Sequence, residues 1–483
     1  MDQSYTPLFT QLQEHYLKRT LSFHVPGHKN GKIFPDLPYS LFSSILNIDA
    51  TELSGLDDLH NPEGVIAQAQ SLAADLYGVD TTYFLINGST VGNLASILSV
   101  AEANDVMIVQ RDCHKSVLNA LKLANILPVF IAPEYDISAH ICTGVKEETV
   151  IKAINQYPWA KGIVLTNPNY YGLTRNLKGI VEHAHNYNIP VIVDEAHGAH
   201  FILGDPFPQS AAEAGADLIV QSAHKTLPAM TMGSYLHVQG SLVNMEKLEF
   251  YLRALQSSSP SYPIMASLDL ARYYLAQLKS DKSEIISLRA ELEQFKQRLN
   301  EIEGLKVMPF SSPDIKEDLL KVMIQPDHRF IKTGYRLQKQ LESYGIYSEL
   351  ADMFRVLFIL PLGKNFPFEE SIHKIREALR NIRDGEPHVS LDKIQSFSFQ
   401  HTSLTISYQQ MQTLKKEFVS FEEAIGRVAA EPVIPYPPGI PILVEGELIT
   451  KDHISYIVHL KKLNANIQGG HAISNRQLKV FLI

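Results

Sequence analysis

An acid and a lysine each follow a short apolar run near the middle of the chain. Asp194 follows the run 189–193, and Lys225 comes shortly after the run 216–220. Runs of this length are typical of buried strands, and α/β proteins bind ligands beyond the carboxyl ends of such strands. An acid there can pair with a protonated pyridine nitrogen, and a lysine can form an imine with an aldehyde. The two residues therefore point to pyridoxal phosphate, whose usual protein partners are a Schiff-base lysine and an aspartate.

A glycine and two hydroxyl residues lie between an expected strand and an expected helix. Gly88, Ser89 and Thr90 stand where the N–H groups and positive potential of a helix N-terminus would favour a phosphate. Ser222 and His224, beside the lysine, would complete such a phosphate site. An ordinary helix N-cap explains the Gly-Ser-Thr sequence equally well, so both interpretations stay open at this point.

Two histidines follow runs that we expect to end at the same edge of the sheet. His114 follows the apolar run 106–109, where an imidazole would stack on a cofactor ring and take part in proton transfer. His197 lies three residues after Asp194 and would face the same region. A structural histidine with satisfied hydrogen bonds is the alternative interpretation of His114.

The residues around Asp194 also fit two other chemistries. The sequence Asp-Glu-Ala-His at 194–197 is the acidic box of helicase-type NTPases, but such enzymes also need a phosphate loop that ends in Gly-Lys-Ser/Thr. The nearest match, at 27–32, is followed by Ile33 instead. Asp194, His197 and His200 have plausible spacing for metal ligands, but no further ligand cluster is evident and the lysine would stay unexplained. We therefore expect no metal site.

Length and composition limit the class of protein. The 483 residues allow a large core and two or three domains, and the net charge of −9, without a long basic block, argues against nucleic acid as a partner. Cys113 and Cys142 are too few for a disulfide framework. No apolar run reaches the ~18–20 residues of a membrane span, and the polar N-terminus lacks a secretion signal. We expect a cytoplasmic protein that does not bind a membrane.

The order of apolar runs and helical patterns predicts an α/β fold with three domains and an N-terminal arm. Alternating strands and helices indicate a mostly parallel sheet covered by helices on both faces. A long helix is expected at 264–299, with a break near 280–283. The expected parts are an arm at 1–62, a large cofactor-binding domain at 63–256, a small α+β domain at 257–384 and a C-terminal domain at 385–483.

Taken together, the motifs resemble the ornithine/lysine/arginine decarboxylase family, which has the aspartate-aminotransferase fold (fold type I of the pyridoxal phosphate enzymes). The chain looks like the short bacterial form, without the N-terminal receiver-like domain of the large inducible members. Residues 442–447 depart from the family, which has Pro-Gly-Glu after its proline-rich C-terminal signature, found here at 435–441. The motifs that carry the resemblance, in order, are His-Val-Pro-Gly-His-Lys at 24–29, Thr-Glu-Leu-Ser-Gly-Leu-Asp-Asp-Leu-His at 51–60, Asn-Gly-Ser-Thr at 87–90, His-Lys-Ser at 114–116, Asp-Glu-Ala-His-Gly at 194–198 and Ser-Ala-His-Lys at 222–225.

The resemblance implies roles for individual residues. Lys225 would be the Schiff-base lysine, Asp194 the partner of the pyridine nitrogen, and His114 the residue that stacks on the ring. Fold type I enzymes build each active site at a dimer interface, and the segment 257–262, with Ser259, is similar to the one by which a second subunit reaches the phosphate. The arm would cross the same interface. The residues implied in phosphate binding are Gly88, Ser89, Thr90, Ser222 and His224.

The reaction implied is decarboxylation of a basic L-amino acid, with arginine or lysine favoured over ornithine. An acid must then bind the distal cation of the substrate, and Lys225, His114 or His197 would return a proton to Cα. An aminotransferase of the same fold is the alternative, with Arg355 as its carboxylate clamp, although an ordinary surface arginine is the other interpretation of Arg355. A non-catalytic pyridoxal phosphate-binding protein is a further alternative. The acids that the sequence leaves as candidates are Glu52, Asp57, Asp58, Glu349, Asp352, Glu445 and Glu447.

Overall fold

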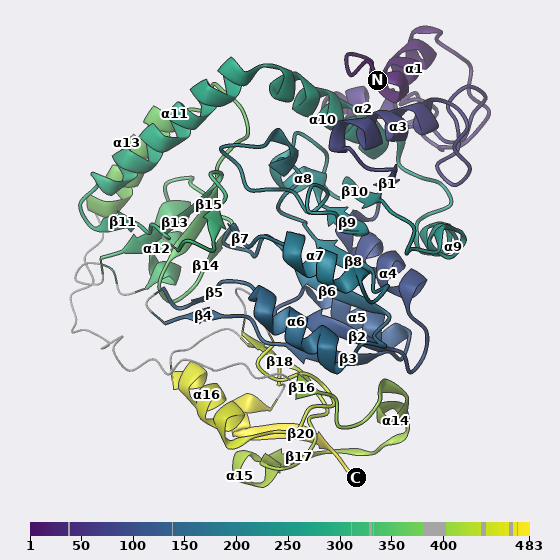
Figure 1. Ribbon diagram of the computed structural model, residues 1–483. Helices are drawn as coiled ribbons and strands as arrows, with labels where there is room; N and C mark the ends of the chain where they lie inside the picture. The colour runs from purple at the N-terminus through teal and green to yellow at the C-terminus, as the bar shows by residue number, and fades with distance from the viewer. Residues whose placement is uncertain are drawn as a thin grey trace. The chain divides into compact units, whose positions relative to one another are not determined.

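The computed structural model describes most of the chain as two compact units (Figure 1). The first unit comprises residues 1–100 and 184–285, and the second comprises residues 101–183 and 286–483. The described residues are 1–36, 39–137, 139–310, 312–327, 331, 333–380, 402–435, 441–462, 467–470 and 472–483.

Four strands of the first unit form the part of the sheet that carries Asp194. Their order is β1 (Thr81–Leu85), β10 (Ser234–Val238), β9 (Leu218–Gln221) and β8 (Val191–Asp194). Strands β8 and β9 are parallel and buried along their whole length, which explains the three apolar residues that precede the polar residue at the end of each. Strand β10 is antiparallel to both of its neighbours.

Helix α4 (Gly88–Val100) packs unusually closely on this group of strands. A Cβ atom at Gly92 would lie only 2.8 Å from side-chain atoms of Leu85 in β1 and Val220 in β9. A glycine is therefore required for the helix to approach the strands at this point. The other helices of this unit are α1 (Pro7–Leu17), α2 (Tyr39–Leu46), α3 (Val65–Tyr77), α7 (Lys178–His185, partly in the second unit), η1 (Phe201–Leu203), α8 (Ala223–Thr226), α9 (Met245–Leu255) and α10 (Tyr262–Ser280).

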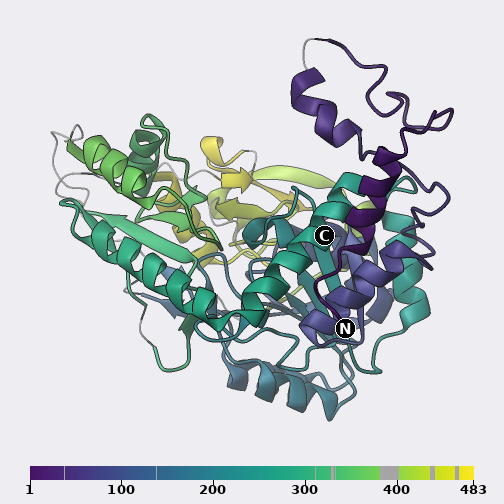
Figure 2. The ribbon, with the colours of Figure 1, turned by 90° about the horizontal axis from the view of Figure 1, so that it is seen from above.

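The N-terminal segment is anchored at its start and exposed further on. Asp269 of α10 accepts hydrogen bonds from the Leu8 and Phe9 N–H groups of α1. By contrast, residues 21–36 and helix α2, dark purple in Figure 2, extend away from α1 and α3. Several of their apolar side chains are open to solvent, with Phe23 97% exposed and Leu41 83% exposed, whereas Leu46 at the end of α2 is buried.

Two sheets organise the second unit. Strands β6 (Gly162–Thr166), β2 (Val106–Gln110), β3 (Leu127–Ile131) and β16 (Thr402–Ser403) lie side by side, with the first three parallel and β16 antiparallel to β3. The smaller sheet has the order β11 (Leu305–Val307), β13 (Lys321–Pro326), β15 (Val356–Ile359) and β14 (Leu350–Ala351). Helices α11 (Lys282–Asn300) and α13 (Phe368–Arg380) run side by side in Figure 1, and their Phe295 and Phe368 rings are 4.5 Å apart.

The C-terminal part of the second unit has a small core of its own. Strands β17 (Lys416–Ser420) and β20 (Gln477–Phe481) pair antiparallel, and Phe421, Leu443 and Ile457 are buried against them. The remaining elements of this unit are β4 (Tyr135–Asp136), β5 (Ile141–Cys142), β7 (Leu173–Thr174), β12 (Lys316–Glu317), β18 (Val433–Pro435), β19 (Ile467–Gly469), α5 (Lys115–Leu123), α6 (Glu147–Gln156), α12 (Gly334–Glu342), α14 (Tyr408–Thr413), α15 (Phe421–Ala424), α16 (Lys451–Lys462) and η3 (Ile473–Asn475).

This architecture confirms the predicted α/β fold with a mostly parallel sheet. The long helix is broken where expected, since α10 ends at Ser280 and α11 begins at Lys282. The expected boundary at 384–385 and residues 436–440 of the proline-rich signature lie outside the described residues, and the domain boundaries stay a prediction. Within the described part of the chain, no helix is both long and apolar enough to cross a membrane.

Candidate functional site

The parallel pairing of β8 and β9 brings the predicted acid and lysine to one edge of the sheet. Asp194 is the last residue of β8 and lies opposite Val220 of β9. Ser222 follows β9 and begins the single turn of α8, which carries His224 and Lys225. The positions of these residues after the two apolar runs therefore correctly predicted that both follow the ends of neighbouring strands.

The Asp194 carboxylate is buried and held from two sides. It is 3% exposed, and its Oδ2 atom accepts a hydrogen bond of 2.9 Å from Nδ2 of Asn93 in α4. Its Oδ1 atom accepts one of 3.2 Å from the Ala196 N–H group. Asn93 was missed by the sequence analysis, although it lies one helical turn after Ser89 and so on the same face of α4.

Lys225 and His197 lie within hydrogen-bonding distance of each other. The Nζ atom of the lysine is 3.0 Å from Nε2 of the histidine, whose side chain is buried. At this distance the amine and the imidazole can share or exchange a proton. The structure thus brings together Lys225 and one of the two histidines predicted to act in catalysis.

The predicted phosphate-binding residues gather at the start of α4. Gly88, with φ of 77°, adopts a left-handed conformation that favours glycine, and its N–H donates to the Met232 carbonyl at 3.0 Å. The Ser222 hydroxyl donates to the Ser89 hydroxyl at 2.8 Å, and Thr90 is exposed. His224 Nδ1 lies 3.1 Å from the Gly233 carbonyl. The helix N-terminus and the hydroxyl groups provide donors suited to an anion.

These groups form a donor set that fits pyridoxal phosphate. A buried carboxylate suits a protonated pyridine nitrogen, a lysine suits the aldehyde, and a helix N-terminus with serine hydroxyls suits the phosphate. Asp194, Lys225 and Ser89 all belong to the first unit and lie at the ends of neighbouring elements.

His114 belongs to the second unit, where it follows β2 and caps helix α5. Its Nδ1 atom accepts a hydrogen bond of 3.2 Å from the Ser116 N–H group and lies 2.8 Å from the Ser116 hydroxyl. The cap fixes the orientation of the imidazole on its own helix. Its stacking on a cofactor ring stays a prediction.

Ser259 lies in an exposed loop after α9. Two contacts within the chain hold this loop: the Ser257 N–H donates to the Asn87 side chain at 3.4 Å, and His60 Nε2 donates to the Ser257 carbonyl at 2.8 Å. The loop thus lies beside the residue that precedes Gly88. A role for Ser259 at the phosphate of a second subunit stays a prediction.

Glu195, directly after Asp194, begins a buried polar chain. Its carboxylate accepts hydrogen bonds from Gln221 Nε2 at 2.6 Å, Ser210 Oγ at 3.0 Å and the Ala211 N–H group at 2.7 Å. Gln221 Oε1 accepts from His237 Nε2 at 3.0 Å. Burial raises the pKa of Glu195 to about 8, and the three donors reduce this increase without cancelling it. The chain ties β8, β9 and β10 together behind the candidate site.

Five of the seven acids that the sequence left as candidates for substrate binding are already engaged within the chain. Asp57 accepts backbone N–H groups at the start of α3, and Asp352 pairs with Arg355. Glu445 pairs with Lys122 and Lys416, and Glu447 pairs with Arg111. Asp58 accepts a hydrogen bond of 2.8 Å from the His60 N–H group. The two other candidates are Glu52 and Glu349.

Arg355, the candidate clamp for an aminotransferase, is engaged inside the second unit. Its side chain is fully buried, so the alternative of a surface arginine is wrong. Nε lies 3.2 Å from Asp352 Oδ2, and a terminal nitrogen donates to the Ala139 carbonyl. Asp352 also accepts a hydrogen bond of 2.9 Å from the Tyr171 hydroxyl. These contacts engage Nε and one terminal nitrogen of the guanidinium within the second unit.

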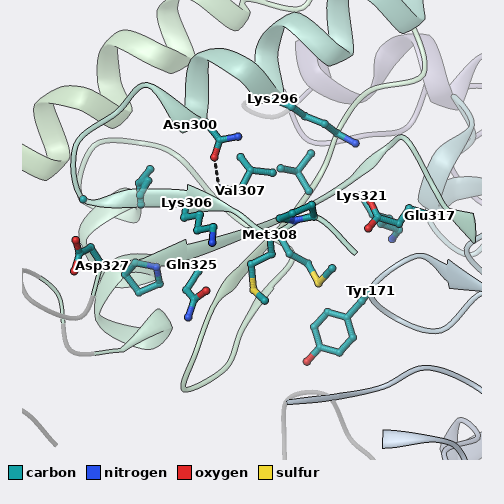
Figure 3. A pocket seen from close by; sticks show the side chains of 16 residues that line it. Tyr171, Lys296, Asn300, Lys306, Val307, Met308, Glu317, Lys321, Gln325 and Asp327 are labelled. Atoms are coloured by element: carbon teal, nitrogen blue, oxygen red, sulfur yellow. Dashed lines mark hydrogen bonds between the residues drawn. The ribbon is translucent and has the colours of Figure 1, made fainter. Parts of the chain in front are cut away.

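A cavity of about 1020 Å³ lies along β11 and β13 in the second unit. Figure 3 shows Lys296 and Asn300 reaching it from α11 on one side of the strands, with Tyr171 and Gln325 on the other. The described residues that line it include none of the predicted site residues. Asp194, His197 and His200, the alternative metal ligands, do not form a metal-binding group among the described residues.

Comparison with known proteins identifies two matching family models and close relatives. Residues 6–332 match the Orn/Lys/Arg decarboxylase major domain, and residues 392–471 match the C-terminal domain of the same family. The chain is 47% identical to the uncharacterized protein YaaO of Bacillus subtilis, over 99% of this chain and 98% of that protein. It is 35% identical to an arginine decarboxylase of the same organism, over 97% of this chain and 95% of that enzyme.

The fold is similar to that of a solved lysine decarboxylase. The structure of LdcF from Francisella novicida superposes with a TM-score of 0.82 and 19% identity, over 99% of this chain and 81% of that one. At this identity the likeness establishes the fold, which is the one predicted.

We expect Glu195 to make stability depend on pH. Because its folded pKa of about 8 exceeds the value of an unfolded glutamate, the folded state binds more protons between these two values. The contribution of Glu195 to the free energy of unfolding should therefore be fully present below about pH 4.3 and decline as pH rises towards 8. Denaturant titrations of wild type and Glu195→Gln from pH 5 to 9 would measure it as a stability difference that shrinks with pH. Exposed Glu246→Gln is the control, and a pH-independent difference for Glu195→Gln would contradict the prediction.

Proposed function

This chain belongs to the Orn/Lys/Arg decarboxylase family, and we propose that it removes the α-carboxylate of a basic amino acid as CO2 with pyridoxal phosphate as cofactor. The observation that carries the proposal is the placement of the Asp194 carboxylate and the Lys225 amine at neighbouring strand ends. The product would be agmatine or a diamine.

Asp194 has the surroundings that a partner of the pyridine nitrogen needs. When bound, pyridoxal phosphate supplies an electron sink for the pair left behind by the departing carboxylate. A carboxylate held by Asn93 and by the Ala196 N–H group remains oriented and would keep a proton on a pyridine nitrogen bound beside it. Burial strengthens this charge interaction because little water competes for it.

Lys225 and His197 form a pair that can hold and move a proton. We propose that Lys225 attaches the cofactor and that its amine, released when substrate binds, returns a proton to Cα. His197, 3.0 Å away, accepts or supplies that proton at Nε2. A group that performs such a transfer from a fixed position contributes typically 10²–10⁴-fold to a rate.

We propose arginine as the first substrate to test, ahead of lysine and ornithine. The support is the 35% identity to an arginine decarboxylase along nearly the full length of both chains. A guanidinium needs a carboxylate that can accept two parallel hydrogen bonds. Glu52 and Glu349 are the candidates for this role, because cations or backbone N–H groups already engage the other acids.

We also propose that the protein works as a homodimer in the cytoplasm. The support is the row of exposed apolar side chains on the N-terminal segment, which a second copy would cover. Leu41, Phe42 and Ile45 come from one helix, α2, and are 83%, 48% and 38% exposed. The spacing of these residues puts them on one face of the helix.

The substrate is tested by measuring labelled CO2 released from carboxyl-labelled arginine, lysine and ornithine. We expect release from arginine at the highest kcat/KM, and no release from amino acids without a distal cation. Release of a 2-oxo acid in place of CO2 would replace the proposed reaction with that of an aminotransferase. Cofactor binding without turnover of any of the three would favour a non-catalytic binding protein.

Lys225→Ala should abolish the covalent attachment of the cofactor and lower kcat by at least about 10²-fold. Borohydride reduction followed by mass spectrometry locates the attachment in wild type, and we expect it on the peptide that contains Lys225. Lys115→Ala is the matched control, because Lys115 also follows a histidine after a strand end. Attachment to any other lysine would refute the assignment.

Leu41→Glu should weaken the dimer, because it places a charge on the apolar face of α2. Sedimentation velocity over a range of concentrations would show dissociation at higher protein concentration than in wild type. Ile286→Glu, at a 68% exposed position of α11, provides the control. An unchanged dimer in Leu41→Glu, or an active wild-type monomer, would rule out the proposed interface.

A further inference from the structure

Arg111, three residues before His114, forms a buried two-pronged ion pair with Glu447 near the C-terminus. One terminal nitrogen lies 2.5 Å from Glu447 Oε1, and the other lies 2.7 Å from Oε2. The side chains are 1% and 2% exposed. Such parallel hydrogen bonds fix the direction of the guanidinium plane as well as its position.

Other C-terminal groups complete the environment of this pair. The Thr402 hydroxyl accepts from Arg111 at 2.7 Å and donates to Glu447 at 2.5 Å. The Ile442 carbonyl accepts from Arg111 at 2.9 Å, and the Val444 N–H donates to Glu447 at 2.8 Å. Two separate C-terminal segments, at 402 and 442–447, thus hold one side chain of the loop after β2.

The loop between Arg111 and His114 is short and tied at both ends. The Arg111 N–H donates to the Ile131 carbonyl of β3 at 3.0 Å, and the Cys113 N–H donates to the Gln110 carbonyl at 3.2 Å. His114 then caps α5. Only two residues separate the ion pair from the imidazole, and both are buried, so a shift of Arg111 has to move the backbone that carries His114.

A need for stability alone does not explain this arrangement. Burying two charges has a large desolvation cost, and well-packed apolar residues often stabilise such a position as well or better. What an ion pair with two parallel bonds provides in addition is a defined geometry.

We propose that Glu447 is a positioning residue, which acts through Arg111 to fix the loop 111–114 and with it the ring of His114. The C-terminal region would then serve the reaction without touching substrate or cofactor. This inference rests on the proposed function in one respect, namely the role of His114 at the cofactor.

The chain offers a matched control two residues away. Glu445 lies in the same C-terminal segment and pairs with Lys122 at 2.5 Å and with Lys416 at 3.0 Å. Lys122 is near the end of α5, eight residues beyond His114. Glu445→Gln therefore removes an ion pair of the same region without removing a partner of Arg111.

The first experiment compares holoenzyme variants by kinetics and by cofactor absorption. Glu447→Gln should lower kcat by about tenfold to a hundredfold, as expected for a displaced catalytic group, while KM changes less than about twofold. Glu445→Gln should retain the wild-type kcat and cofactor absorption spectrum. The His114→Asn variant keeps a good helix cap. In this background, adding Glu447→Gln should lower kcat little further, because both changes act through the loop 111–114. Fully additive losses would overturn the proposal.

A second variant distinguishes the proposed positioning role from a loss of activity caused by misfolding. Arg111→Met combined with Glu447→Leu replaces the pair by apolar side chains, which keeps the site packed. We expect a melting temperature close to that of wild type, faster hydrogen exchange in the peptide that contains residues 111–116, and a reduced kcat. Wild-type exchange and wild-type kcat in this variant would overturn the proposal. The exchange measurement does not depend on turnover, so it still tests the loop if none of the proposed substrates is decarboxylated.

Discussion

The parallel register of β8 and β9 is the constraint on which the candidate site depends. Asp194 lies opposite Val220, so the strand ends and the residues that follow them are aligned. A slip of one residue would turn every side chain of a strand to the opposite face of the sheet. The carboxylate and the turn that carries Lys225 would then no longer serve the same ligand. The close approach of α4, permitted by Gly92, depends on the same two strands.

Adjacent residues at these strand ends belong to different parts of the structure. Asp194 and Ser222 belong to the candidate site, whereas Glu195 and Gln221, each next to one of them, hydrogen-bond to each other in the buried chain behind it. Alternation of side chains along an extended backbone makes this division possible. Site geometry and sheet geometry are therefore linked through adjacent peptide bonds.

The sequence was informative where function depends on local patterns. Uninterrupted apolar runs located β8 and β9, and Asp281 between two helical patterns marked the break of the long helix. The sequence was uninformative for charged residues whose partners lie far away along the chain. Arg111 and Glu447 are 336 residues apart, and charged residues are by default expected in solvent, so nothing local indicates a buried pair. For the same reason Arg355 could be mistaken for a surface residue, and Glu445 and Glu447 for ligands of a substrate.

The short strand β16 has a consequence for the edge of the sheet. Thr402 and Ser403 pair antiparallel with Phe130 and Val129 of β3, so that C-terminal residues cover the open hydrogen-bonding groups of that strand. Exposed strand edges readily recruit other chains, and natural proteins cover or interrupt them. Strand β16 is only two residues long, and the hydrogen bonds of the Thr402 hydroxyl with Arg111 and Glu447 help to hold it in place. The ion pair that orients Arg111 is therefore also linked, through Thr402, to the segment that covers this strand edge.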